Sequence, residues 1–95
     1  MKNFLDIIIL GELRDAHLSG FDIIVFIQKK FNVNLSPGTV YATLYSLERH
    51  NLIQGTWLER KRVYKLTQTG AQTLKELLEA NVAIKSFTSK ILKVH

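Results

Sequence analysis

The order of residue patterns in this 95-residue chain predicts a mainly α-helical fold with one small β-hairpin and a long last helix. Three segments in the first half carry helix-starting signals, and two short segments rich in β-forming residues follow Asn51. From residue 68 onward the pattern is helical almost to the end, without a proline. Because no Pro-, Gly- or Ser-rich linker divides the chain, we expect one structural unit with a thin core.

The first two helices are predicted at about residues 4–14 and 20–31. Each begins near a polar residue that stands three positions before an aspartate, the spacing of a helix-starting box. The first helix is apolar around nearly its whole circumference and must therefore be covered on more than one side. The second ends in lysines, which the helix dipole favours there, although its β-branched run is also compatible with a strand. The two boxes are Asn3 with Asp6 and Ser19 with Asp22.

A third helix is predicted to begin at Pro37, with Ser36 as its cap. The serine hydroxyl can accept a hydrogen bond from an unpaired first-turn amide, and a proline at the first position lacks only a donor that would have had no partner. At about 100° per residue, Val40, Leu44 and Leu47 fall on one side. The other side is small, hydroxyl-bearing or basic, with Gly38, Ala42, Tyr45, Ser46 and Arg49 outward and Thr39 and Tyr41 on the flanks.

This bare outer side suits the major groove of DNA. Small residues near the helix start let the backbone amides approach an anionic surface closely. An ordinary surface helix, the alternative interpretation, usually exposes several Glu and Lys, whereas here only Glu48, Arg49 and His50 are charged or titratable. The pattern therefore favours a helix that reads DNA.

A β-hairpin is predicted from two β-rich segments, 52–58 and 62–66, which flank a charged bend at 59–61. The basic tip and the net charge of +5 favour a polyanionic partner. Trp57 stands beside apolar neighbours, so we expect it to pack under the hairpin as a core aromatic rather than to stack on bases. The basic residues of this region are Arg60, Lys61, Arg62 and Lys65.

The last helix is predicted to start after Thr67 and to run for about 26 residues, which is about 40 Å. A domain of this size has a radius of gyration of about 13 Å, so the helix must project beyond its own core. Positions 74, 77, 81, 84, 88 and 91 recur with the spacing of a helical seam, with Asn81 as a polar member suited to fix register. The alternative interpretation is a frayed tail with scattered hydrophobic residues.

We therefore expect a homodimer, in which the last helix and the apolar first helix pack against their two-fold mates. The chain is therefore expected to consist of a DNA-binding part, residues 1–67, and a dimerisation helix, residues 68–95, which continues directly from the DNA-binding part. The predicted dimerisation residues are Phe4, Ile8, Leu77, Asn81, Ile84, Phe87 and Ile91.

Several classes of protein are disfavoured. The absence of cysteine excludes disulfides and thiolate metal sites, and His17, His50 and His95 are too scattered for a metal motif. No nucleophile with a base and no pair of acids is evident, so we assign no catalysis and no cofactor. With no secretion signal and no apolar run near the roughly 20 residues that span a bilayer, we expect a cytoplasmic protein with no membrane partner.

Three helices, a basic hairpin and a long helix are the order of a winged helix-turn-helix. The chain resembles the PadR family of transcriptional regulators through four motifs, which run in order over almost its full length. The third and fourth together are the most specific, and Ser19 departs from the histidine that is usual in the second. The motifs lie at residues 9–13, 19–23, 35–48 and 62–70.

The resemblance implies a cytoplasmic, dimeric DNA-binding regulator, often a repressor, of the short-tailed subgroup. Some proteins of that subgroup bind flat hydrophobic compounds through aromatic residues of the last helix. Here that helix has Phe87 as its only aromatic residue, so we leave a small-molecule effector unassigned.

The resulting prediction is a sequence-specific repressor that acts as a homodimer on an inverted-repeat site in double-stranded DNA. The alternative is an architectural or protein-interaction winged helix that does not read sequence. The candidate DNA-binding residues are Ser36, Gly38, Thr39, Tyr41, Ala42, Tyr45, Arg49, Arg60, Lys61 and Arg62.

Overall fold

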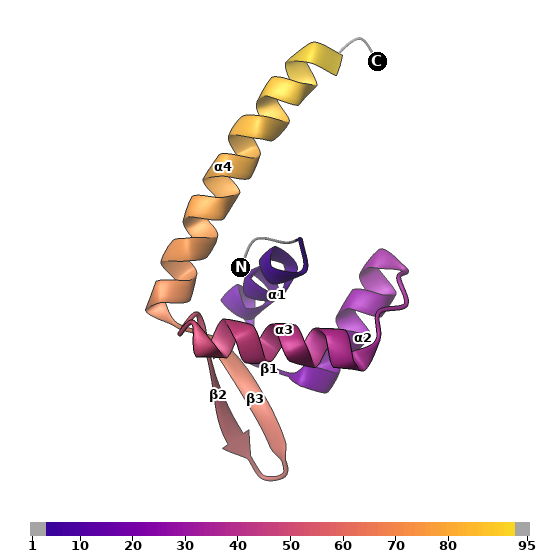
Figure 1. Ribbon diagram of the computed structural model, residues 1–95, viewed down its shortest axis with the longest axis vertical. Helices are drawn as coiled ribbons and strands as arrows, with labels where there is room; N and C mark the ends of the chain where they lie inside the picture. The colour runs from indigo at the N-terminus through magenta and orange to yellow at the C-terminus, as the bar shows by residue number, and fades with distance from the viewer. Residues whose placement is uncertain (1–3, 93–95) are drawn as a thin grey trace.

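The computed structural model describes the backbone of residues 4–92 and the side chains of residues 4–80. Within these residues four helices and three strands follow one another (Figure 1). The predicted helices and the hairpin are confirmed, with boundaries that shift by a residue or two. The elements are α1 (Phe4–Asp15), β1 (Leu18–Ser19), α2 (Gly20–Phe31), α3 (Pro37–Arg49), β2 (Ile53–Leu58), β3 (Lys61–Leu66) and α4 (Gln68–Leu92).

The hairpin is part of a three-stranded antiparallel sheet in the order β1-β3-β2. The sequence did not predict β1, because a strand of two residues has no periodicity to recognise. The hairpin turn is also shorter than expected. Leu58 pairs with Lys61, so the bend consists of Glu59 and Arg60 alone, with Glu59 in the left-handed region at φ 59°.

Local hydrogen bonds explain where the helices begin. At α2 the Asp22 amide donates to Ser19 Oγ at 3.1 Å and the Ser19 amide donates to Asp22 Oδ2 at 3.2 Å, which confirms the predicted box and the helical interpretation of this β-branched segment. These bonds, chiefly the one from the Ser19 backbone, lower the pKa of the Asp22 carboxyl below its usual value of 3.8. The predicted caps Ser36 and Thr67 accept from the third amides of α3 and α4. Asn3 lies outside the described residues.

The core lies where α1, α2 and α3 meet the sheet and the first turns of α4. Ile9, Leu10 and Leu13 of α1 are at most 2% exposed, as the all-round apolar pattern of that helix requires. Leu74 of α4 belongs to the same core and is 2% exposed. The expectation that position 74 opens an intersubunit seam is therefore wrong, because α1 of the same chain covers this turn.

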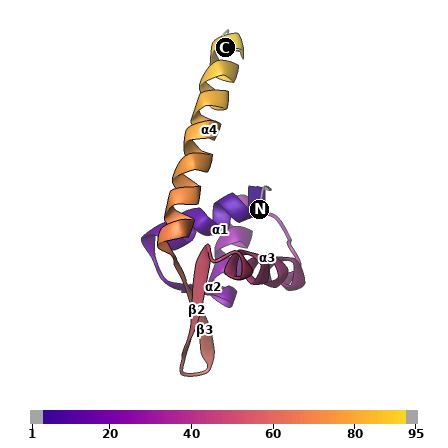
Figure 2. The same cartoon turned by 60° about the vertical axis from the view of Figure 1, so that its left-hand side comes forward.

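Beyond this contact α4 leaves the body, as expected from its length. Both views show it rising away from α1, while the hairpin extends in the opposite direction (Figures 1 and 2). The molecule measures 52 × 29 × 20 Å along its principal axes. Four predicted dimerisation residues, Asn81, Ile84, Phe87 and Ile91, have side chains outside the described residues.

Candidate nucleic-acid interface

The third helix has the two sides that its sequence predicts. Val40, Leu44 and Leu47 are at most 1% exposed and hold α3 in the core. Tyr41 and Tyr45 are 45% and 65% exposed. The remaining predicted contact residues of this helix and its cap, Ser36, Gly38, Thr39, Ala42 and Arg49, are exposed as well.

The start of α3 is ordered by its hydroxyl groups and open at its glycine. Ser36 Oγ lies 2.9 Å from Thr39 Oγ1, and it also accepts from the Thr39 amide at 3.2 Å. A Cβ placed on Gly38 would meet only Ser36 Oγ, at 3.9 Å. Packing within the chain therefore does not require glycine at position 38, and its small size leaves the first-turn backbone accessible from outside.

Two side chains on α3 are fixed by neighbours. The Arg49 guanidinium lies 5.9 Å from the centre of the Tyr45 ring, a cation–π distance that keeps both groups on the exposed side. Tyr41 packs against the first residue of α2, where any side chain in place of Gly20 would overlap the tyrosine ring. Tyr41 therefore lies at the junction of α2 and α3, not at the centre of the outer side.

The three basic residues of the hairpin, which we call the wing, take different positions. Arg60 and Lys61 are exposed at its tip. Arg62 instead turns toward α3, where its Nη2 donates to Glu48 Oε2 at 2.6 Å. The same carboxylate oxygen accepts from the Gly55 amide of β2 at 3.2 Å, so Glu48 ties both strands of the wing to the recognition helix.

Trp57 does not pack under the wing. It is 68% exposed, and its neighbour Leu58 is 63% exposed, so the expectation of a core aromatic is wrong. The outer part of the wing is a two-stranded ribbon, because β1 pairs only with residues 63 and 64 of β3. The Arg62 guanidinium lies 5.5 Å from the centre of the Trp57 ring.

A hollow of about 440 Å³ lies between the start of α2, α3 and the wing. Among the residues that line it are Tyr41, Trp57, Arg60, Lys61 and Arg62, which combine aromatic rings with cations. Tyr64 also lines this hollow and is buried, and this burial, followed by the nearby Glu48 charge, raises the pKa of the phenol above its usual value of 10.0. The phenol therefore stays neutral near pH 7.

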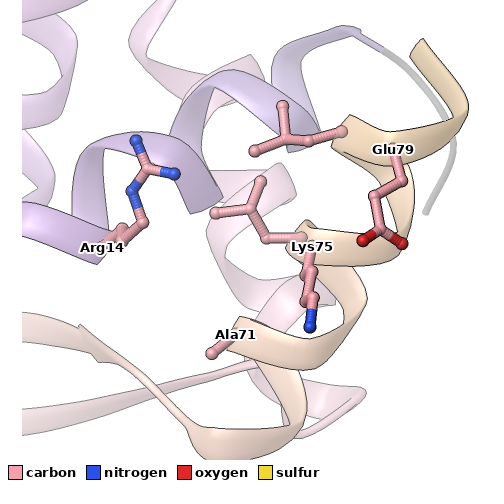
Figure 3. A pocket seen from close by; sticks show the side chains of 6 residues that line it. Arg14, Ala71, Lys75 and Glu79 are labelled. Atoms are coloured by element: carbon pink, nitrogen blue, oxygen red, sulfur yellow. The ribbon is translucent and has the colours of Figure 1, made fainter. Parts of the chain in front are cut away.

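A second hollow, of about 360 Å³, lies where the end of α1 meets α4 and shares no lining residue with the first. Arg14 reaches toward it from α1, while Lys75 and Glu79 stand on α4 around a floor of leucine side chains (Figure 3). Within the described residues no group of three or more His, Cys, Asp or Glu could hold a metal ion. Nor does this part of the chain contain a helix long and apolar enough to cross a membrane.

Three helices, a three-stranded antiparallel sheet and a hairpin tied to the third helix define a winged-helix protein with an exposed recognition helix. The chain belongs to the transcriptional regulator PadR-like family, whose profile matches residues 9–76. It is therefore a transcriptional regulator, as the four motifs implied, and membership of this family makes it a non-enzymatic protein.

Solved structures agree with this assignment. A PadR family regulator from Clostridium difficile R20291 superposes with a TM-score of 0.85 at 25% identity, over 95% of this chain and 99% of that one. PadR from Bacillus subtilis, solved in complex with operator DNA, superposes with a TM-score of 0.70 at 29% identity, over 80% of this chain and 47% of that one. A PadR-like regulator from Bacillus cereus, 20% identical with a TM-score of 0.87 over 96% and 93% of the chains, supports the fold. A comparison with curated proteins finds no match.

Proposed function

We propose that this regulator is a cytoplasmic, sequence-specific repressor that binds an inverted-repeat DNA site as a homodimer. In this proposal residues 1–67 bind DNA and residues 68–95 form the dimerisation helix. The observation that carries the proposal is the outer side of α3, which is exposed, small near its start and free of acidic residues until Glu48. The operator complex of the Bacillus subtilis relative supports DNA as the partner.

In the proposed complex α3 lies in the major groove with its exposed outer side toward the DNA. The hydroxyls of Ser36 and Thr39, with those of Tyr41 and Tyr45, hold phosphates and set the register. Arg49 and the residues at the helix start, including Gly38 and Ala42, face base edges, because arginine makes paired hydrogen bonds to guanine.

The wing contributes backbone contacts through Arg60 and Lys61. Their exposure supports this role, whereas the bond of Arg62 to Glu48 uses that guanidinium within the chain. We therefore propose that Arg62 mainly holds the wing in position against α3. The sequence had predicted that it contacts DNA directly.

Dimerisation is supported by apolar surface that one chain leaves uncovered. Phe4 is 68% exposed, and with Ile8, Phe31 and Val33 it lines an apolar hollow of about 530 Å³ beside α1. Patches of this kind mark contact surfaces in soluble proteins. A two-fold dimer joined along α1 and α4 would place the two α3 helices in successive major grooves, about 34 Å apart. A monomer mass in light scattering at micromolar concentration would exclude this arrangement.

The experiment that tests the function is selection of bound duplexes from a random pool, followed by titration of the selected palindrome and of random duplex. A repressor that reads sequence binds the palindrome about 10³-fold or more tightly. Equal affinity for both would favour the architectural alternative and contradict sequence-specific readout.

Salt dependence then tests the wing. If two subunits neutralise about six phosphates, log Kd should change with log salt concentration with a slope of about 5 in magnitude. Substituting Arg60→Ala together with Lys61→Ala removes four cations per dimer and should lower that magnitude by about 3 to 4. The control is Lys75→Ala on α4, an exposed lysine away from α3 and the wing, which should leave the slope unchanged. An unchanged slope in the double variant would remove the wing from the interface.

A further inference from the structure

The exposure of Trp57 is the least expected feature of the wing. Tryptophan is the largest apolar side chain, and leaving its ring in water forgoes the free energy of burial. At 68% exposed it is as open as any large hydrophobic residue of the described part of the chain. A ring in this position is best explained by a partner that covers it.

The surroundings of the ring identify the chemistry of that partner. Trp57 lines the hollow between α2, α3 and the wing together with Tyr41 and the cations Arg60, Lys61 and Arg62. Aromatic faces that alternate with cations suit a strand of nucleic acid, whose sugars and bases are flat or apolar and whose phosphates are anionic.

The acidic groups near the hollow do not cancel its positive charge. Glu48 is bonded to Arg62, and Asp22 lies close enough to Lys61 for their charges to interact. Glu59 stands at the turn of the wing, beside Arg60. Arg60 is exposed, and among the described residues no ion pair to its guanidinium is found.

Arg62 gives the ring a defined position. Its guanidinium lies 5.5 Å from the centre of the Trp57 ring, opposite it in the β2–β3 register, and is itself held by Glu48 at 2.6 Å. One face of the indole therefore rests on a group anchored to α3. The other face is presented outward at a fixed distance from the recognition helix, so little conformational freedom is lost when a partner covers it.

We propose that Trp57 is a DNA-contact residue of the wing, whose indole packs on a deoxyribose of the strand that passes through the hollow. Arg60 and Lys61 pair with the phosphates on either side of that sugar. Arg62 is a positioning residue, which holds the ring through Glu48 and does not itself bind a phosphate. The inference rests on the proposed DNA-binding function and adds a contact that does not depend on charge.

The protein carries its own reporter for this contact, because Trp57 is its only tryptophan. Titrating the unmodified chain with the selected palindrome should change the tryptophan emission, and saturating duplex should protect it from quenching by acrylamide. A complex in which Trp57 remains as open to acrylamide as in the free protein would overturn the proposal without any substitution.

Substitutions measure the contribution of the contact. Trp57→Ala should weaken binding to the palindrome about tenfold, from the loss of an aromatic contact, and should leave the salt slope unchanged. Leu58→Ala is the matched control, since Leu58 is 63% exposed on the same strand but does not line the hollow. Arg62→Gln should weaken binding more in the parent than in the Trp57→Ala background, because part of its effect acts through the indole.

The outcomes separate this inference from the function on which it rests. If the parent binds no duplex, both the proposed function and the Trp57 contact are refuted. If the parent binds the palindrome and Trp57→Ala binds it equally well, the wing contact alone is refuted. An equal loss in Leu58→Ala and Trp57→Ala, with no protection of the indole, would assign the exposed wing residues to a protein partner or to folding of the hairpin.

Discussion

Replacing the glycine at the start of the recognition helix should have opposite effects on the stability of the fold and on DNA binding. Gly38 is the second residue of α3, with a negative φ, and the nearest contact of an added Cβ would be Ser36 Oγ at 3.9 Å. Alanine therefore fits without strain. Since glycine costs a helix about 0.5 to 1 kcal/mol relative to alanine, Gly38→Ala should stabilise the fold by up to that amount.

For a domain of this size, 1 kcal/mol corresponds to a rise in Tm of about 4 to 8 °C, so a rise of a few degrees is expected. In DNA binding the same methyl group occupies the space through which the first-turn backbone approaches the groove. We expect Gly38→Ala to weaken binding to the selected palindrome about tenfold, which is about 1.4 kcal/mol.

The assays are thermal unfolding at one chain concentration, since Tm of a dimer depends on concentration, and anisotropy of a labelled duplex. Gly11→Ala is the control, because a Cβ on Gly11 has no atom within 4 Å and this residue of α1 is neither a candidate DNA-binding residue nor a candidate dimerisation residue. It should raise Tm without changing DNA affinity. A Gly38→Ala variant that is more stable and binds the palindrome as tightly as the parent would refute the close approach of α3 to DNA.

Three further predictions concern the scaffold. Gly70→Ala should destabilise the fold by about 2 kcal/mol or more in chemical denaturation, because a Cβ there would overlap the carbonyl oxygen of Leu52; an unchanged midpoint would contradict this packing. Glu48→Gln should lower DNA affinity several-fold, because it weakens the hydrogen bonds that hold the wing against α3. The circular dichroism spectrum should stay near that of the parent, since the helices remain. Parental affinity would show that DNA binding does not need these bonds. The pKa of Asp22 is lowered in the folded state, so its ionised carboxylate adds stability that is present above pH 3.8 and is lost as pH falls through the folded pKa. The difference in unfolding free energy between the parent and Asp22→Asn should therefore shrink in acid.

The sequence predicted those elements whose signals lie within a few residues of one another. The boxes and caps at Ser19, Ser36 and Thr67 involve partners three positions away, and all three start helices in the structure. The inner and outer sides of α3 also follow directly from its spacing, because a regular helix places residues by angle alone. For the same reason the outer-side candidates for DNA contact needed no tertiary information.

Features that depend on distant partners could not be predicted in this way. The two-residue strand β1 exists only because β3, more than forty positions later, supplies its hydrogen bonds, with Leu18 opposite Tyr64. Leu74 fits an intersubunit seam by its spacing, yet α1 covers it within the same chain. In both cases a periodic pattern shows that a face is apolar but not which surface meets it.

The wing shows which features follow from the sequence and which follow only from the tertiary structure. Its strands, its basic residues and the uncommon tryptophan were evident from the sequence. Only the tertiary structure directs Arg62 to Glu48, 14 residues earlier in the chain, and leaves Trp57 in water. The physical reason is that side-chain burial and ion pairing depend on which elements come within a few ångströms of each other, and this is set by the packing of the whole domain.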